Sequence, residues 1–160
     1  MNPLPESAVQ SEADSKAFCK EVLVRFSDCD PAGIVFYPKY FEMFNSLIED
    51  WCREALQFSF VEIVARRGWG LPTVHVETDF LAPSRYGETL KATLRLRNLG
   101  NSSITLEIGL RGIDEVPRVN AAAVLVLIDR AAMCAIPFPD DVRRRLSALL
   151  GLPAAVPEAR

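Results

Sequence analysis

The stretch PKYFEMFNSLIEDWCREAL, residues 38–56, is the most informative part of the chain for its architecture. Its large apolar side chains recur every three or four positions, and charged or amide side chains fill the positions between them. This spacing is typical of an amphipathic helix that buries one face. Burial of each large side chain contributes roughly 1.5–3 kcal/mol, so we expect this helix to be central to the core. The apolar positions are Tyr40, Phe41, Phe44, Leu47, Ile48, Trp51, Cys52, Ala55 and Leu56.

Strand patterns follow the helix, because the spacing of apolar residues changes to two. Such alternation is typical of β-strands with one face in the core and the other in water. Residues 100–102 form a turn between two of these strands and predict an antiparallel hairpin. Residues 119–128 are apolar on both faces apart from Asn120, so we expect them to be covered on both sides, by this chain or by a second subunit. The predicted strands are residues 71–80, 90–97, 104–111 and 119–128.

Further elements are predicted around this centre. Residues 19–26 alternate weakly and predict a first strand, and residues 60–67 predict a shorter helical piece. A last helix is expected from Asp140, as its N-cap, through Leu150, with Gly151 closing it.

The order of these elements predicts an α+β fold, in which one antiparallel sheet wraps around a single long helix. We assign residues 18–151 to this one domain, which agrees with a chain of 160 residues. Residues 1–17 lack apolar periodicity and are expected to be a disordered N-terminal segment. Residues 152–160 read as a loose C-terminal tail rich in proline and alanine.

Composition narrows the functional classes. A formal net charge of -3 argues against a nucleic-acid binder, which carries a basic excess. No apolar run approaches the ~20 residues that span a bilayer, and residues 1–16 lack the layout of a signal peptide, so we expect a cytoplasmic protein away from membranes. The four cysteines form no CxxC pair and no zinc-like spacing, so we expect no metal.

A carboxylate loop, residues 28–37, lies just ahead of the predicted helix. The start of a helix offers unpaired N–H groups and about half a positive charge, which suits a carbonyl oxygen that turns anionic during acyl transfer. A nearby carboxylate can attack that carbonyl or deprotonate a water. The residues alone leave open a purely structural alternative, in which Asp30 caps a turn formed with Pro31 and Gly33.

The run RFSDCDPAGIVFY, residues 25–37, resembles the signature of the 4-hydroxybenzoyl-CoA thioesterase family of hotdog-fold proteins, whose form is D-x-D-x-x-G-x-V followed by an aromatic residue and a tyrosine-bearing helix. Residues 78–83 and 87–90 are similar to a second, more generic landmark of hotdog proteins. The resemblance covers residues 22–150. It implies a hotdog fold and an acyl-CoA thioester substrate with an aromatic or short-to-medium acyl group, hydrolysed by water without a metal or organic cofactor.

The resemblance also implies roles for single residues. Asp30 matches the catalytic carboxylate, as nucleophile or general base, and the backbone N–H of Tyr37 matches the group that polarises the thioester oxygen at the helix start. Gly33 then lets the chain approach the substrate without a Cβ in the way. The remaining substrate-binding candidates in this run are Ile34, Val35 and Phe36.

The grip on the CoA phosphates departs from the family pattern, because residues 100–102 carry no charge where relatives can have a basic cluster. We therefore place Arg95, Arg97 and Arg111 as candidate phosphate ligands on the wet strand faces. Residues 143–145, three consecutive arginines, are a further candidate, with a solvated helix face as the alternative. A carrier-protein thioester stays open as a substrate.

Rival hypotheses rest on other residues. His75, Glu77 and Asp79 share one strand face, but Cβ atoms almost 7 Å apart suit a polar outer face better than a metal site. Cys29 with His75 would form a nucleophilic pair only if both met in space. A non-catalytic acyl-thioester-binding module on the same fold is the alternative to an enzyme. The two-sided apolar strand predicts a homo-oligomer, either a dimer or a dimer-of-dimers tetramer, with each site at a subunit interface.

Overall fold

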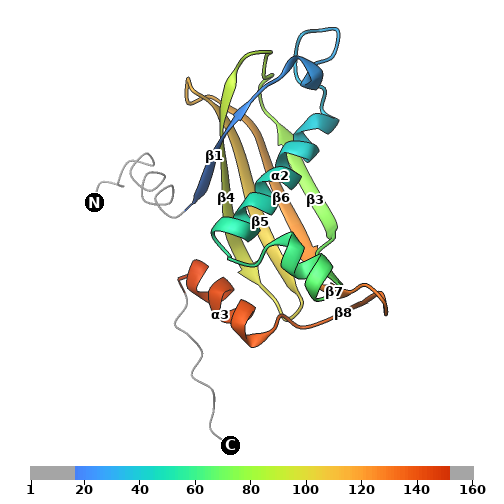
Figure 1. The fold of residues 1–160 in the computed structure, drawn as a ribbon. Coiled ribbons are helices and arrows are strands. Elements are labelled where there is room, and N and C mark those ends of the chain that lie inside the picture. Colours follow the sequence, from blue (N-terminus) through green and yellow to red (C-terminus); the bar gives the residue numbers. More distant parts are fainter. Residues whose placement is uncertain (1–16, 152–160) are drawn as a thin grey trace, which may run out of the picture.

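A computed structural model of the protein describes residues 17–151 (Figure 1). The predictions for residues 1–16 and 152–160 lie outside this range. The chain forms the elements that follow, in order. They are β1 (Phe18–Leu23), a 3-10 turn (Phe26–Asp28), α2 (Pro38–Glu54), a π-helical segment (Val61–Arg66), β2 (Trp69–Gly70), β3 (Thr73–Phe80), β4 (Thr89–Leu99), β5 (Ser103–Gly112), β6 (Pro117–Val126), β7 (Ile128–Asp129), β8 (Cys134–Ala135) and α3 (Asp140–Leu149).

The main sheet has five antiparallel strands in the order β1-β4-β5-β6-β3. The expected hairpin is β4 with β5, and Leu94 opposite Ile108 gives its register. Side chains alternate along β5 between buried and partly exposed, as the period of two predicts. The sheet therefore presents one continuous apolar face.

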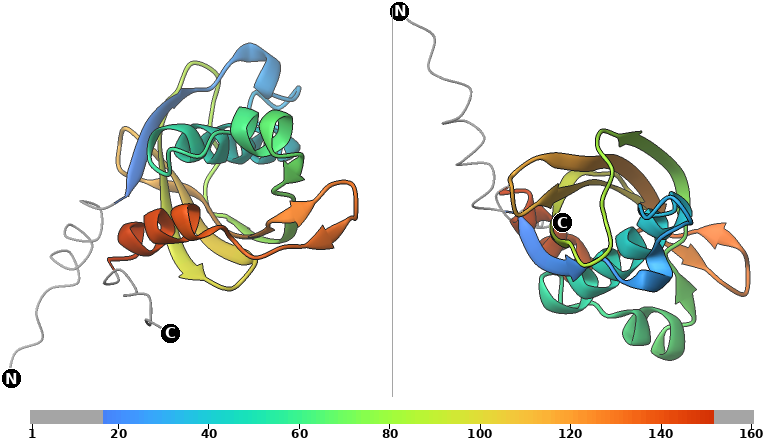
Figure 2. Two further views of the ribbon diagram at one scale, coloured as in Figure 1. Left: turned by 60° about the horizontal axis from the view of Figure 1, so that its bottom comes forward. Right: turned by 90° about the horizontal axis from the view of Figure 1, so that it is seen from above.

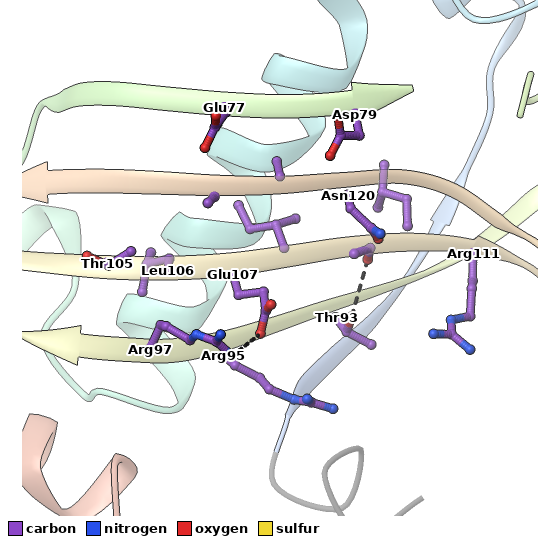
Figure 3. Close-up of a pocket in the computed structure, with 15 residues that line it drawn as sticks. Glu77, Asp79, Thr93, Arg95, Arg97, Thr105, Leu106, Glu107, Arg111 and Asn120 are labelled. Carbon is purple, nitrogen blue, oxygen red and sulfur yellow. Dashed lines mark hydrogen bonds and ion pairs between the residues drawn. The ribbon is translucent and has the colours of Figure 1, made fainter. Parts of the chain in front are cut away.

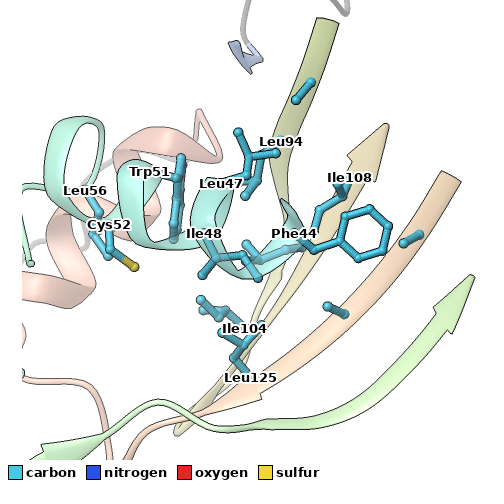
Figure 4. Close-up of a cluster of buried hydrophobic side chains, with 14 of the residues drawn as sticks. Phe44, Leu47, Ile48, Trp51, Cys52, Leu56, Leu94, Ile104, Ile108 and Leu125 are labelled. Atoms are coloured by element: carbon cyan, nitrogen blue, oxygen red, sulfur yellow. The ribbon is translucent and has the colours of Figure 1, made fainter. Parts of the chain in front are cut away.

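Helix α2 covers that face. Figure 2 shows the sheet curving around one side of α2, and Figure 4 shows the interlocking side chains. The helix contributes six buried residues, among them Phe44, Leu47 and Trp51, and the sheet contributes Leu94, Ile108 and Leu125 from three different strands. The amphipathic pattern of residues 38–56 therefore identified the helix that seals the core.

The cover is uneven across the sheet. Strand β6 lies between β5 and β3, and its buried face includes Val119, Ala123 and Leu125. The other face of β6 is only half-buried. Within the described residues, the expected cover is therefore complete on one face of this strand and partial on the other. Strand β3 is the exposed element, because its inward-facing Val76 and Phe80 are 40% and 51% exposed. One edge of the sheet thus leaves apolar surface open to water.

Several boundaries differ from the sequence predictions. The first strand ends at Leu23, because the chain enters a 3-10 turn that Asp28 caps by accepting the N–H of Arg25 at 2.8 Å. Asp140 is the first residue of α3 and not its N-cap, which is Pro139. Proline has no side-chain oxygen that could accept an N–H of the first turn, so it does not resemble a typical N-cap residue. The prediction therefore assigned the N-cap to the acidic residue that follows it.

A second, three-stranded sheet in the order β2-β7-β8 was missed. Its strands are two residues long, too short for any period to be recognised. Helix α3 then packs Val142 and Leu146 into the core. The guanidinium of Arg143 donates to the carbonyl of Asn101 at 2.7 Å, and Arg145 donates to the carbonyl of Gln57. These two arginines therefore tie α3 to the turns beside it.

Substitution of a buried leucine tests the assignment of the core. Leu106 on β5 is fully buried, so Leu106→Ala should lower the free energy of unfolding by about 2–5 kcal/mol. Leu149→Ala, at a 39% exposed position on α3, is the matched control and should change it by less than about 1 kcal/mol. Urea denaturation measures both values, and equal losses would contradict the packing described.

Candidate active site

Residues 28–36 form a short hairpin in front of α2. The backbone N–H of Asp30 donates to the carbonyl of Ile34 at 3.0 Å, and the N–H of Phe36 donates to the carbonyl of Asp28 at 2.9 Å. Between these two bonds, Cys29 and Val35 form an antiparallel bridge. The hairpin therefore holds its acidic leg alongside the leg that leads into the helix.

Asp30 lies at the tip of the hairpin and is half-buried. Its Oδ1 accepts the N–H of Ala32 at 2.8 Å, and its carbonyl accepts the N–H of Gly33 at 2.9 Å. The structural role that the sequence left open is thus present. Oδ2 has no hydrogen-bond partner within residues 17–151, so one carboxylate oxygen remains available for chemistry.

The first residues of α2 leave one N–H unused. Phe36, Lys39 and Tyr40 donate their N–H groups to carbonyls within the turn. Pro38 is the first helical residue and has no N–H. In the described part of the chain, Tyr37, the N-cap, is the residue of this run whose N–H meets no acceptor. A free donor at the positive end of a helix is suited to an oxygen that gains negative charge.

Aromatic rings surround this donor. The Phe36 and Tyr37 rings are 5.4 Å apart, and the Tyr37 ring lies 6.3 Å from that of Phe80 at the end of β3. All three side chains are about half exposed or more. Tyr40, which is buried, contacts Phe80 from behind at 5.7 Å. The helix start therefore carries an open aromatic surface, to which Phe80 comes from a distant part of the sequence.

The other residues of the motif have distinct surroundings. Val35 is buried in the core, and Ile34 is half-buried and bridges to Arg85. Gly33 has a φ of +76°, and a Cβ placed on it would meet no atom within 4 Å. Its glycine is thus required by backbone conformation, independently of any approach to a substrate.

Cys29 shares the hairpin with Asp30 but is a poor nucleophile. Partial burial, followed by the negative charges of Asp28 and Asp30, raises the pKa of its thiol above the ordinary value. The reactive thiolate is therefore scarce at neutral pH. His75, its hypothetical partner, lies on β3 opposite Val124 of β6 and is exposed.

The three arginines predicted to grip phosphates lie elsewhere. They line a hollow of about 570 Å³ on the face of the sheet opposite α2, to which none of residues 28–37 contributes (Figure 3). Arg97 pairs with Glu107 at 3.5 Å and Arg111 with Glu115 at 3.7 Å. Arg95 lines the same hollow. The structure thus brings together the motif residues and keeps the arginines apart from them.

Residues 17–151 contain neither a cluster of metal ligands nor a membrane-spanning helix. No three His, Cys, Asp or Glu side chains in that range gather closely enough to hold a metal ion, and His75, Glu77 and Asp79 simply follow one strand. The helices in that range are also too short or too polar to cross a bilayer.

Comparison with known proteins identifies the family of the chain. The family model described as "Thioesterase-like superfamily" matches residues 24–146, which is more than half of the chain. A 1,4-dihydroxy-2-naphthoyl-CoA hydrolase of Synechocystis is 30% identical over 79 residues. That alignment covers 49% of this chain and 56% of the relative, so it spans little more than half the length of that protein.

Solved structures extend the similarity over most of the chain. A 1,4-dihydroxy-2-naphthoyl-CoA thioesterase from Synechocystis superposes with a TM-score of 0.76 at 22% identity and covers 86% of this chain and 99% of its own. A gentisyl-coenzyme A thioesterase gives 0.72 at 25% identity, covering 79% of this chain and 99% of its own. At 22% identity, the similarity to the Synechocystis structure shows a shared fold alone.

The conformation of Gly33 yields a prediction. Because a side chain in the left-handed region costs roughly 1–2 kcal/mol, Gly33→Ala should lower the free energy of unfolding by about 1 kcal/mol. Gly33→Asn should lose less, since asparagine tolerates that region. Urea denaturation of both variants is the measurement. Equal stability of Gly33→Ala and the parent protein would show that the turn is not strained by a side chain.

Proposed function

Since the chain belongs to the thioesterase-like superfamily, we propose that it hydrolyses acyl-CoA thioesters that carry an aromatic acyl group. The catalytic groups in this proposal are the carboxylate of Asp30 and the backbone N–H of Tyr37. In this proposal, the hotdog fold holds the hairpin that carries Asp30 ahead of the N-terminal end of α2, where Tyr37 lies.

One observation carries the proposal. Within residues 17–151, a carboxylate with an unpaired oxygen and a helix-start N–H without an acceptor occur in one hairpin of nine residues followed by the N-cap. Ester and thioester hydrolysis needs these two functions, a base or nucleophile and a donor for the oxyanion. Asp30 and Tyr37 are also the positions to which the family resemblance assigns these two roles.

The chemistry follows from the two groups. The thioester oxygen accepts the N–H of Tyr37 and gains negative charge as the tetrahedral intermediate forms. In one route Asp30 removes a proton from water while the water oxygen bonds to the carbonyl carbon. The C–S bond then breaks, and the CoA thiolate leaves and takes up that proton. In the other route the carboxylate bonds to the carbon and expels the thiolate. Water then cleaves the resulting anhydride into the free acid and the Asp30 carboxylate, and the proton that this releases goes to the CoA thiolate.

The aromatic surface supports the choice of acyl group. Phe36, Tyr37 and Phe80 expose ring faces beside the proposed oxyanion donor. Aromatic rings gain about 0.5–1.5 kcal/mol from edge-to-face or offset contacts beyond the burial of their area. The similar proteins named above act on dihydroxynaphthoyl and gentisyl thioesters, both of which are aromatic.

We also propose that the protein acts as a homodimer through β3. This edge strand exposes its backbone and the side chains of Val74, Val76 and Phe80. An unprotected edge of this length invites pairing with another strand. A second copy of β3 would extend the sheet and cover the apolar side chains, and it would place the partner chain beside the aromatic surface at Phe80.

Asp30→Asn tests the catalytic assignment. The asparagine oxygen can still accept the N–H of Ala32, so the hairpin should persist, but hydrolysis should fall by about 10²-fold or more. Thiol release from benzoyl-CoA and related aromatic thioesters is the measurement. Asp28→Asn in the same hairpin is the matched control and should stay close to the parent activity. An active Asp30→Asn variant would remove Asp30 from the mechanism.

A charge-insertion variant tests the dimer. Val74→Lys with Val76→Lys should fold, because both side chains are exposed in the single chain, yet it should shift the protein to monomers by placing cations in the shared sheet. Light scattering at micromolar concentration reports the mass. Val64→Lys, at an equally exposed valine away from β3, should leave the mass unchanged. A parent protein that is monomeric would refute the proposal directly.

A further inference from the structure

Ser84 is a buried polar residue at an unexpected place. It lies in the segment between β3 and β4, yet its side chain is fully buried. The hydroxyl of Tyr40 on α2 donates to its Oγ at 3.0 Å. Tyr40 is itself only 4% exposed, so this hydrogen bond is shielded from water. A shielded bond of this kind is costly to break, because either hydroxyl left alone would be buried without a partner.

The same serine also holds the hairpin of the candidate site. Its carbonyl accepts the N–H of Val35 at 2.9 Å, and its neighbour Arg85 bridges to Ile34. One residue thus contacts the helix through its side chain and the hairpin through its backbone. Ser84 joins the two elements that carry the proposed catalytic groups.

The segment around Ser84 is anchored to the main sheet. The N–H groups of Leu81 and Ala82 donate to the carbonyl of Arg118 on β6, at 2.8 and 3.2 Å. The nearly buried guanidinium of Arg118 in turn contacts the carboxylate of Glu88, which also accepts the N–H of Arg85 at 3.0 Å. The support for the hairpin is therefore the rigid sheet and not a free loop.

We propose that Tyr40 and Ser84 form a positioning pair for the hydrolysis proposed above, on which this inference rests. The pair sets where the Asp30 hairpin lies relative to the start of α2. Tyr40 is three residues beyond Tyr37 and donates its N–H to the Tyr37 carbonyl at 3.2 Å. Hydrogen bonds thus connect Tyr37 to Tyr40, Tyr40 to Ser84, and Ser84 to Val35. This path restrains the hairpin relative to the helix start in addition to the restraint that the backbone between them provides.

The expected effect is on turnover more than on substrate binding. Neither hydroxyl is exposed, so neither can touch the acyl group or CoA. Misplacement of reacting groups by about 1 Å can cost up to about 10²-fold in rate. Loss of the pair should therefore lower kcat by about tenfold or more, while KM changes by less than about threefold.

Single-atom variants provide the test. Tyr40→Phe and Ser84→Ala each remove one hydroxyl, and the double variant should be no slower than the slower single variant, because all three lack the same bond. Tyr86→Phe, at a 65% exposed tyrosine, is the matched control and should keep the parent kcat. The proposal is overturned if kcat per folded molecule is unchanged in Tyr40→Phe, or if the two single effects multiply.

Amide hydrogen exchange separates this proposal from the proposed function. In Tyr40→Phe, amides of residues 28–37 should exchange faster, while those of β4 and β5 stay as slow as in the parent protein. Uniform acceleration would mean a general loss of stability, and no change would mean that the pair does not hold the hairpin. A parent protein without thioesterase activity would defeat the proposed function, and the exchange result would still decide whether the pair fixes the hairpin.

Discussion

The packing of α2 against the apolar face of one sheet is the interaction on which the rest of the structure depends. A single helix of 17 residues covers β4, β5 and β6 through side chains such as Phe44 and Trp51. One helix is too narrow to cover all five strands fully, so Val76 and Phe80 on the inward face of β3 stay 40% and 51% exposed, although Tyr40 of α2 contacts Phe80. The same packing holds the start of α2 at the edge of the core, where Tyr37 and the hairpin are open to a substrate. The packing of α2 on the sheet therefore both buries the core and leaves the start of the helix exposed.

The placement of the Asp30 hairpin beside the start of α2 arises from local and long-range contacts together. The hairpin supplies the local part, since its legs pair within nine residues. The long-range part comes from residues 80–88, which contact the hairpin and are hydrogen-bonded to Arg118 of the sheet. A short motif can therefore be easy to recognise, although its geometry depends on residues far along the chain.

The parts of the fold that follow a period were predictable from the sequence. The helix at residues 38–56 and the alternating strands emerged with small errors at their ends, because apolar spacing reports directly on burial. Phe80 was placed on the apolar face of a strand, but no periodic pattern could tell that α2 covers it only in part. The Tyr40–Ser84 bond and the two-residue strands rest on tertiary contacts, which leave no local signal. The motif predicted the candidate residues, but it could not show that the N–H of Tyr37 meets no acceptor in the described part of the chain, because that depends on the three-dimensional start of the helix.

The raised pKa of the Cys29 thiol has a consequence for the proposed hydrolysis, whose product is itself a thiol. Released coenzyme A oxidises readily to disulfides, which capture protein cysteines by exchange, and the attacking species in that exchange is the cysteine thiolate. Burial, and after it the charges of Asp28 and Asp30, disfavour the anion, so Cys29 should react slowly with such disulfides although it lies in the same hairpin as Asp30. If the proposed hydrolysis takes place, adducts with oxidised coenzyme A are therefore expected first at the exposed Cys19 and Cys134.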